Sequence, residues 1–255
     1  MTEKITLKDA LSGLTQKADV DSIVARDSSG TPVYIKKSDL AKVMASLMPS
    51  DSLYDKLNDG VFIMYHRKSD SSTLMSKLSL WTGLQDKGET ADGVVVVDDG
   101  RFLVVAPTEA STTLMWSSAG VSGGGTSTSE KTTALNDWNG KDNTRKQIAA
   151  SAEGAVTSTE SYAPGFCNLY SGEKLTAGQW WLPSMGELMM IFAHMGKINY
   201  ALSLIDGADQ LKMNAYWSST EFNNTRAWNL NIGTGYPYST AKTDFRLVRP
   251  VSAFI

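Results

Sequence analysis

The hydrophobic positions of the first fifty residues follow a different pattern from those of the rest of the chain. A turn-forming stretch, residues 27–32, precedes the apolar residues 33–35, which predict a short strand. Ser38 is a suitable N-cap for a helix that ends before Pro49. Four apolar residues of that helix share one face: Leu40, Val43, Met44 and Leu47. Such a short helix either packs on the main domain or serves as a docking or oligomerisation arm.

From residue 60 onward the hydrophobic pattern predicts strands. Residues 61–65 form a compact apolar run. Residues 94–97 and 102–105 flank Asp98-Asp99-Gly100, which predicts a β-hairpin. Residues 117–133 are rich in Ser, Gly and Thr and predict a solvated loop, because the Gly-Lys-Ser/Thr ending of a phosphate-binding loop is missing.

Two helices are predicted after this loop. The first begins near Asp142 or Asn143 and ends at Gly154, with Ile148, Ala149 and Ala152 turned inward. The second begins with the capping box Ser184-Met185-Gly186-Glu187, and Gly196 is its predicted end. Its apolar residues recur at helical spacing, at Leu188, Ile191, Phe192 and Met195.

The C-terminal stretch returns to a strand pattern. Trp228, Leu230 and Ile232 alternate with Asn229 and Asn231, which predicts one buried and one wet face. Phe245 and Leu247 repeat the buried pattern, and residues 233–240 between these strands predict a loop. Strands followed by two helices and a loop-rich β region predict an α+β fold.

Composition narrows the classes of function. The 255 residues carry a net charge of −3 and no polybasic segment, so we expect no nucleic-acid binding. The hydrophobic content of 42% suffices for a real core. A single cysteine, Cys167, excludes an intramolecular disulfide, and with only His66 and His194 we expect no metal site and no cofactor. No nucleophile–base motif is visible, so we expect no catalytic residues and no enzymatic activity.

The N-terminus is polar and lacks the apolar segment of a secretory signal. No run of about eighteen apolar residues occurs, so we expect no membrane insertion. These features predict a protein made in a host cytoplasm.

Four motifs occur in an order that resembles one family. They are G-K-x-N-T at residues 140–144, W-x-L-P-S-x-G-E-L at 180–188, Y-W-S-S-T-E at 216–221 and V-R-P-V at 248–251. The series resembles the bacterial and phage C-type-lectin-like domains related to the formylglycine-generating enzyme fold, which include the variable proteins of diversity-generating retroelements. The resemblance covers about residues 90–255. It implies a C-type-lectin-like domain over residues 51–255, preceded by a small arm over residues 1–50.

The resemblance also sets expectations for individual residues. It implies that Trp181, Trp217 and Trp228 belong to the core and stack on sugars only as a second role. Arg246 and Arg249 are expected to pair with carboxylates or carbonyls beside the sheet. The formylglycine-generating enzymes use a pair of cysteines, whereas Cys167 stands alone and is expected to fill the core. The calcium-binding loops of sugar-binding C-type lectins are missing, so no calcium site is expected.

The resemblance implies a bacteriophage fibre or receptor-binding protein located in the virion. Its arm would contact other virion proteins and support a homotrimer, and its lectin-like domain would bind a glycan or protein of the host surface. The alternatives are a structural head or tail decoration protein, a bacterial surface adhesin module and an enzyme of the formylglycine-generating class. The lone cysteine argues against the enzyme.

We predict that the ligand-binding surface lies between Tyr216 and Thr243, where the relatives diversified by retroelements carry their variable positions. The predicted ligand-binding residues are Asn223, Asn224, Arg226, Asn229, Asn231, Tyr236 and Tyr238. The strand pattern predicts Asn229 and Asn231 on the solvent face. The alternative is a polar loop whose two tyrosines cover the core or a neighbouring subunit.

Overall fold

The computed structural model describes residues 22–26, 29–36, 59–151 and 157–254. The chain divides into two compact units, Met1–Leu57 and Asn58–Ile255. In the first unit, β1 (Ser22–Arg26) and β2 (Pro32–Lys36) form an antiparallel hairpin. The strand predicted at residues 33–35 lies inside β2, whereas β1 was not predicted. The predicted helix after Ser38 lies outside the described residues.

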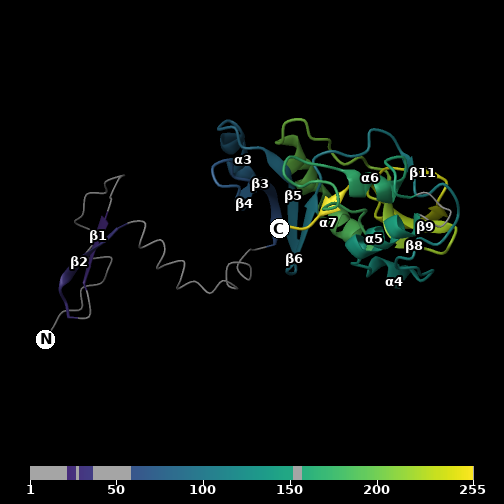
Figure 1. Ribbon diagram of the computed structural model, residues 1–255, viewed down its shortest axis with the longest axis horizontal. Helices are drawn as coiled ribbons and strands as arrows, with labels where there is room; N and C mark the ends of the chain where they lie inside the picture. Colours follow the sequence, from purple (N-terminus) through teal and green to yellow (C-terminus); the bar gives the residue numbers. More distant parts are fainter. Residues whose placement is uncertain (1–21, 27–28, 37–58, 152–156, 255) are drawn as a thin grey trace. The chain divides into compact units, whose positions relative to one another are not determined.

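The second unit contains a five-stranded antiparallel sheet in the order β12-β6-β5-β3-β4 (Figure 1). Its strands are β3 (Gly60–His66), β4 (Thr73–Lys77), β5 (Ala91–Asp98), β6 (Arg101–Val105) and β12 (Val251–Ser252). The predicted hairpin is confirmed, because β5 and β6 pair around a two-residue turn at Asp99 and Gly100. Both turn residues have positive φ, 46° and 72°, as a type I′ turn requires.

The four consecutive valines of β5 have a simple packing reason. Val94 and Val96 face one hydrophobic cluster, and Val95 and Val97 face another on the opposite side of the sheet. A strand covered on both faces needs an unbroken apolar run rather than an alternating one.

Two smaller antiparallel sheets complete the β structure. One has the order β10-β9-β8, with β8 at Ala215–Glu221, β9 at Arg226–Asn231 and β10 at Tyr236–Ala241. The other pairs β7 (Leu114–Met115) with β11 (Phe245–Arg246). In Figure 1 the five-stranded sheet lies at one end of the second unit, and β8, β9 and β11 lie at the other. The α+β class with antiparallel sheets that the sequence predicts is therefore confirmed.

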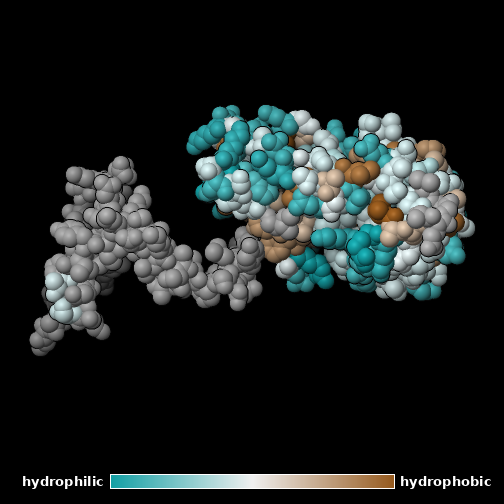
Figure 2. Space-filling model, in the orientation of Figure 1, coloured by the Kyte–Doolittle hydropathy of each residue, from teal (hydrophilic) through white to brown (hydrophobic). Residues whose placement is uncertain are grey.

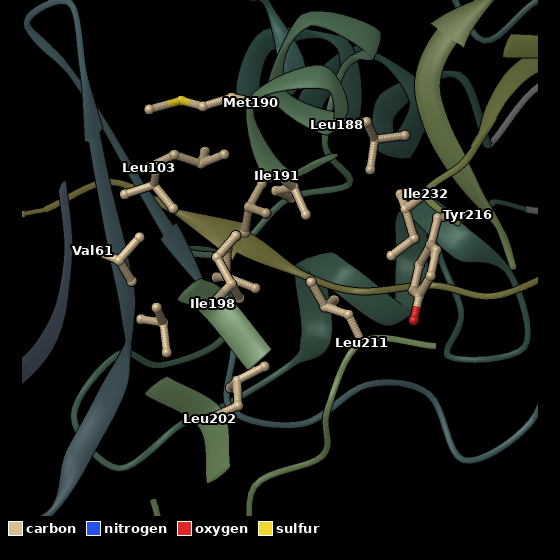
Figure 3. Close-up of a cluster of buried hydrophobic side chains, with 14 of the residues drawn as sticks. Val61, Leu103, Leu188, Met190, Ile191, Ile198, Leu202, Leu211, Tyr216 and Ile232 are labelled. Carbon is tan, nitrogen blue, oxygen red and sulfur yellow. The ribbon is translucent and has the colours of Figure 1, made fainter. Parts of the chain in front are cut away.

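Helix α7 (Met185–Ser203) packs on both of the larger sheets. Figure 3 shows Ile191, Ile198 and Leu202 of this helix between Val61 of β3 and Ile232, which follows β9. The capping box is confirmed, with the Ser184 N–H donating to Glu187 Oε2 at 2.7 Å. The predicted end at Gly196 is wrong. Burial of Ile198 and Leu202 carries the helix to Ser203.

The predicted first helix differs from the structure in its start and in its buried face. Helix α5 runs from Gly140 to Ala150, whereas the predicted Gly154 and Ala152 lie outside the described residues. Ile148 is half-buried and Ala149 is exposed. The buried positions beyond Gly140 are polar instead: Asn143, Thr144 and Gln147. They are buried because their side chains bond to groups of neighbouring segments, such as Leu182 N–H and Ser219 O.

Three further helices were not predicted: α3 (Leu78–Gln85), α4 (Lys131–Leu135) and α6 (Ala163–Leu169). Helix α4 occupies the end of the stretch predicted as a loop over residues 117–133. The predicted loop over residues 233–240 is also wrong in its second half, because residues 236–241 pair with β9 as strand β10. Phe245 was predicted to be buried but is 55% exposed, whereas Leu247 is buried.

Candidate functional site

The two faces of strand β9 are covered by different parts of the molecule. Trp228 and Leu230 point to the cluster that contains α7. On the other face, Trp217 of β8, Asn229 of β9 and Tyr238 of β10 lie in one row across the sheet. The next row holds Ala215, Asn231 and Tyr236. This second face therefore changes from apolar at β8 to polar and aromatic at β10.

The predicted solvent exposure of Asn229 is wrong. Its side chain is 1% exposed, and its amide donates to Thr240 Oγ1 at 2.7 Å and Tyr238 O at 3.2 Å. Alternation along the strand is correct, but the face opposite α7 is covered as well, because Trp217 packs there in a second cluster. Asn231 is half-buried, and its Oδ1 accepts the Gly233 N–H in the turn after β9.

A groove with a volume of about 430 Å³ opens on this second face. It is lined by Thr113, Asn214, Ala215, Asn229, Asn231, Tyr238, Ser239, Thr240, Phe245, Arg246 and Leu247. The floor comes from β8, β9 and β10, and β11 supplies a wall. Its size lies within the usual range for small-molecule sites.

Two aromatic side chains stand at the groove with much of their surface in water. Tyr238 is 47% exposed and Phe245 is 55% exposed. Tyr236, which is 52% exposed, packs against Tyr238 with 4.7 Å between ring centroids and an interplanar angle of 48°. The visible face in Figure 2 carries hydrophobic residues only in small patches among polar ones. Exposed aromatics grouped at a polar hollow are typical of binding surfaces.

Arg246 is the only charged side chain among the described residues that line the groove. Its guanidinium donates to Phe245 O at 2.6 Å and to Thr240 Oγ1 at 3.3 Å, and it lies over the Trp217 ring at 5.9 Å. Arg249 is buried and donates to Pro107 O at 3.3 Å and to Asp209 O. The prediction that both arginines bond to carbonyls beside the sheet is confirmed.

The structure separates the seven predicted binding residues into two groups. Asn229, Asn231 and Tyr238 line the groove, and Tyr236 packs on Tyr238 beside it. Of the other three, Asn223 and Asn224 lie in the turn between β8 and β9, and Arg226 is the first residue of β9. There Asn223 Oδ1 accepts the N–H groups of Thr225 and Arg226, Asn224 is exposed, and Arg226 donates to Ser239.

Several lining residues were missed by the sequence analysis: Thr113, Asn214, Phe245 and Arg246. Phe245 and Arg246 reach the groove only because β11 pairs with β7, more than a hundred residues earlier in the chain. The sequence carries no local signal of that pairing. The alternation of Phe245 and Leu247 instead predicted that Phe245 is buried.

Residues from three of the shared motifs form a buried polar cluster together with Asp137, which lies just before the first motif. We call this cluster the motif network: Asp137, Asn143, Thr144, Trp181, Glu187 and Thr220. Asp137 Oδ2 accepts from Asn143 Nδ2 at 2.9 Å and from Thr220 Oγ1 at 2.8 Å. Trp181 Nε1 donates to Glu187 Oε1 at 3.2 Å. Burial raises the pKa of Glu187 to about 7. The motifs therefore hold loops and helix ends together.

The glycine-rich segment is a loop with mostly exposed residues up to Glu130, as predicted, but two of its glycines lie against a buried ion pair. Glu221 accepts the N–H of Gly123 at 2.9 Å and of Gly125 at 3.2 Å, and it pairs with Lys242. Both charged side chains are almost completely buried, and burial lowers the pKa of Lys242. A β-carbon at Gly123 would lie 2.7 Å from Gln147 and Trp116, so only glycine fits this close approach.

A second polar chain joins strands β3, β4 and β5. Thr73 Oγ1 lies 3.0 Å from His66 Nε2, and His66 Nδ1 lies 2.6 Å from Asp92 Oδ2. A hydroxyl, imidazole and carboxylate in this order also occur in hydrolases. Here His66 and Thr73 are a cross-strand pair and neither lines the groove, so the contacts are explained by strand pairing.

Within the described residues, no group of three or more His, Cys, Asp or Glu side chains could hold a metal ion. No helix in the same part of the chain is long and apolar enough to cross a membrane. Trp181, Trp217 and Trp228 are all buried, which confirms their predicted place in the core.

The fold and the groove define an α+β domain with a polar, aromatic-flanked hollow on one sheet face. Residues 106–252 match the model of the Lcl C-terminal domain, and this match covers more than half of the chain. The chain therefore belongs to the Lcl C-terminal domain family.

The other comparisons found little further similarity. No curated protein matches the chain. Among solved structures, a fimbrial protein from Bacteroides ovatus ATCC 8483 is 17% identical, with a TM-score of 0.45. That match covers 60% of this chain and 36% of the fimbrial chain.

Proposed function

We propose that this protein is a non-enzymatic attachment module that binds a host-surface ligand in the groove on the β8–β10 sheet. The observation that carries the proposal is the arrangement of Tyr238 and Phe245, both about half exposed, beside a hollow of amide, hydroxyl and guanidinium groups. Aromatic rings supply contact area at a small entropic cost, and amide side chains supply adaptable hydrogen bonds.

The state of Cys167 supports a non-enzymatic role. Its side chain is fully buried in the second cluster, and burial raises the pKa of its thiol well above the ordinary value. The reactive form of cysteine is the thiolate, so this thiol is a poor nucleophile.

The carrier that we propose is a bacteriophage fibre, with residues 1–50 as the arm that joins the particle and supports a homotrimer. This part of the proposal rests on what the sequence resemblance implies about the carrier. A virion decoration protein or a bacterial surface adhesin would carry the same groove. Deleting residues 1–50 separates these possibilities. On the fibre proposal the truncated protein still binds cells but no longer self-associates or joins particles, which centrifugation with particles measures.

The binding proposal is tested by Tyr238→Ala, with Tyr200→Ala as the matched control. Tyr200 is 58% exposed on α7 and does not line the groove. Binding of fluorescently labelled protein to a panel of bacterial strains is the measurement. We expect Tyr238→Ala to weaken attachment by about 2 kcal/mol or more, as central interface aromatics do. Tyr200→Ala should bind normally, and both should melt close to the parent.

Two results would contradict the binding proposal. Normal attachment by Tyr238→Ala and by the double variant Tyr236→Ala/Tyr238→Ala would place recognition elsewhere. Attachment to no strain by the parent protein would remove the attachment role itself.

A further inference from the structure

The charge distribution of the groove is one-sided. Arg246 is the only charged lining residue, and none of the described carboxylates lies within ion-pair distance of it. Two of its five N–H groups bond to Phe245 O and Thr240 Oγ1. The guanidinium is half-buried and lines the groove, so its remaining N–H groups can donate to a ligand there.

The surroundings of Arg246 determine which ligand group fits it. The bonds to Phe245 O and Thr240 Oγ1 and the contact with the Trp217 ring hold the guanidinium in one orientation. A fixed guanidinium binds a planar carboxylate through two parallel hydrogen bonds, and such charged bonds are stronger than neutral ones. Among the groups that a ligand can offer, a carboxylate therefore fits the Arg246 guanidinium best.

The rest of the groove suits a hydroxylated ring. Thr113, Asn214 and Ser239 present hydroxyl and amide groups, which exchange hydrogen bonds with sugar hydroxyls. Tyr238 and Phe245 offer ring faces against which the apolar side of a sugar can pack.

We propose that the groove binds a carboxylated sugar, with its carboxylate on Arg246 and its ring against Tyr238 or Phe245. The proposal rests on the attachment function above and names the ligand class of the same site. It differs from recognition of a neutral glycan, a sulfated glycan or a protein, and each of these is a distinct outcome of the test.

The probe is the purified surface polysaccharide of a strain to which the protein attaches. It is used in native form and after chemical reduction of its carboxylates to alcohols, which leaves sulfates in place. Biolayer interferometry measures the affinity of the full-length protein for both forms. We expect reduction to weaken binding about tenfold to a hundredfold, as the loss of a charged hydrogen-bonded pair does.

Variants connect that loss to Arg246. Arg246→Gln should bind native polysaccharide more weakly than the parent by the same factor, and it should bind the reduced form as weakly as the parent does. Arg246→Lys should keep part of the preference for native over reduced polysaccharide. Arg145→Gln, which removes an exposed arginine of α5 outside the groove, should behave as the parent. Melting temperatures establish that each variant is folded. If Arg246→Gln does not fold, Arg246→Lys decides alone, and an affinity equal to the parent on native polysaccharide would overturn the proposal.

Equal binding of native and reduced polysaccharide would overturn the proposal in favour of a neutral or sulfated glycan. Attachment to cells without binding to their polysaccharide would overturn it in favour of a protein. In both cases a loss of attachment in Tyr238→Ala would leave the groove as the recognition site, so failure of this inference is distinct from failure of the proposed function.

Discussion

Lys242 and Arg246 lie four residues apart in the chain and have opposite surroundings. Lys242 is completely buried, pairs with Glu221 and lies 4.3 Å from the Trp116 ring centre. Arg246 lines an open groove and has no carboxylate partner among the described residues. A cation that is buried with its partner is satisfied within the fold, and removing that partner is costly, whereas a cation that lines a groove is available to a ligand. Both residues are cations, so their different roles follow from where each side chain lies in the fold and not from the residue type.

The sequence motifs follow the same division. The motif network and Glu221 are buried, whereas no residue of the four motifs lines the groove. Ala215 and Leu247, which do line it, directly precede the motifs at 216–221 and 248–251. A protein built in this way can change its groove without disturbing its scaffold. If this is so, substitutions in the buried regions change stability and leave attachment through the groove unchanged.

The largest effect is expected at the buried ion pair. Lys242→Met leaves Glu221 buried without its partner and should lower the free energy of unfolding by about 3–5 kcal/mol. Urea denaturation followed by fluorescence measures the loss. The double variant Lys242→Met/Glu221→Gln should recover part of it, because no uncompensated charge remains. A loss below about 1 kcal/mol in the single variant would mean that the pair is exposed to water.

A smaller effect is expected from Glu187 and depends on pH. Its pKa is raised to about 7 by burial, so the folded state favours the protonated carboxyl. The contribution of this group to stability is fully present below pH 4.5 and is lost as pH rises through 7. A shift from 4.5 to about 7 corresponds to about 3 kcal/mol. Glu187→Gln should therefore reduce the fall in stability between pH 5 and pH 8, as denaturation at several pH values would measure. An unchanged slope would exclude this carboxyl as the cause.

The packing of the motif network is tested by a single methyl group. A β-carbon at Gly140 would overlap the Glu187 carboxylate, so Gly140→Ala should cost about 1–3 kcal/mol. Gly196→Ala is the matched control, because a β-carbon there meets nothing within 4 Å and lies inside α7. It should stabilise the protein by about 0.5–1 kcal/mol. Equal melting temperatures for the two variants would show that the start of α5 can move away from α7.

The smallest effect is expected at Cys167. Cys167→Ala removes a small buried side chain and should cost about 1–2 kcal/mol of stability. Attachment to cells should be unchanged, since the residue lies in the second cluster and not at the groove. A stable Cys167→Ala protein that no longer attaches would contradict both the non-enzymatic role and the separation of scaffold from groove.

The features that depend only on neighbouring residues could be predicted from the sequence. The Asp99-Gly100 turn, the valine-rich strand before it and the capping box at Ser184 were predicted, because turn conformation and helix capping involve only a few consecutive residues. Tyr236 and Tyr238 were predicted as residues of a binding surface, and both are about half exposed, although they lie on a strand and not on a loop.

Contacts between distant segments decide which polar residues are buried and which are exposed. Asn229 is buried because Trp217 and Tyr238 occupy its sheet face, and α5 buries Asn143 and Gln147 because distant backbone groups need partners. Phe245 and Arg246 reach the groove through pairing with residues more than a hundred positions earlier. Hydrophobic periodicity indicates which side of a helix or strand faces the core. It does not indicate that a strand is covered on both sides, or that a polar helix face is buried because it bonds to backbone groups. Both of these depend on contacts between distant segments.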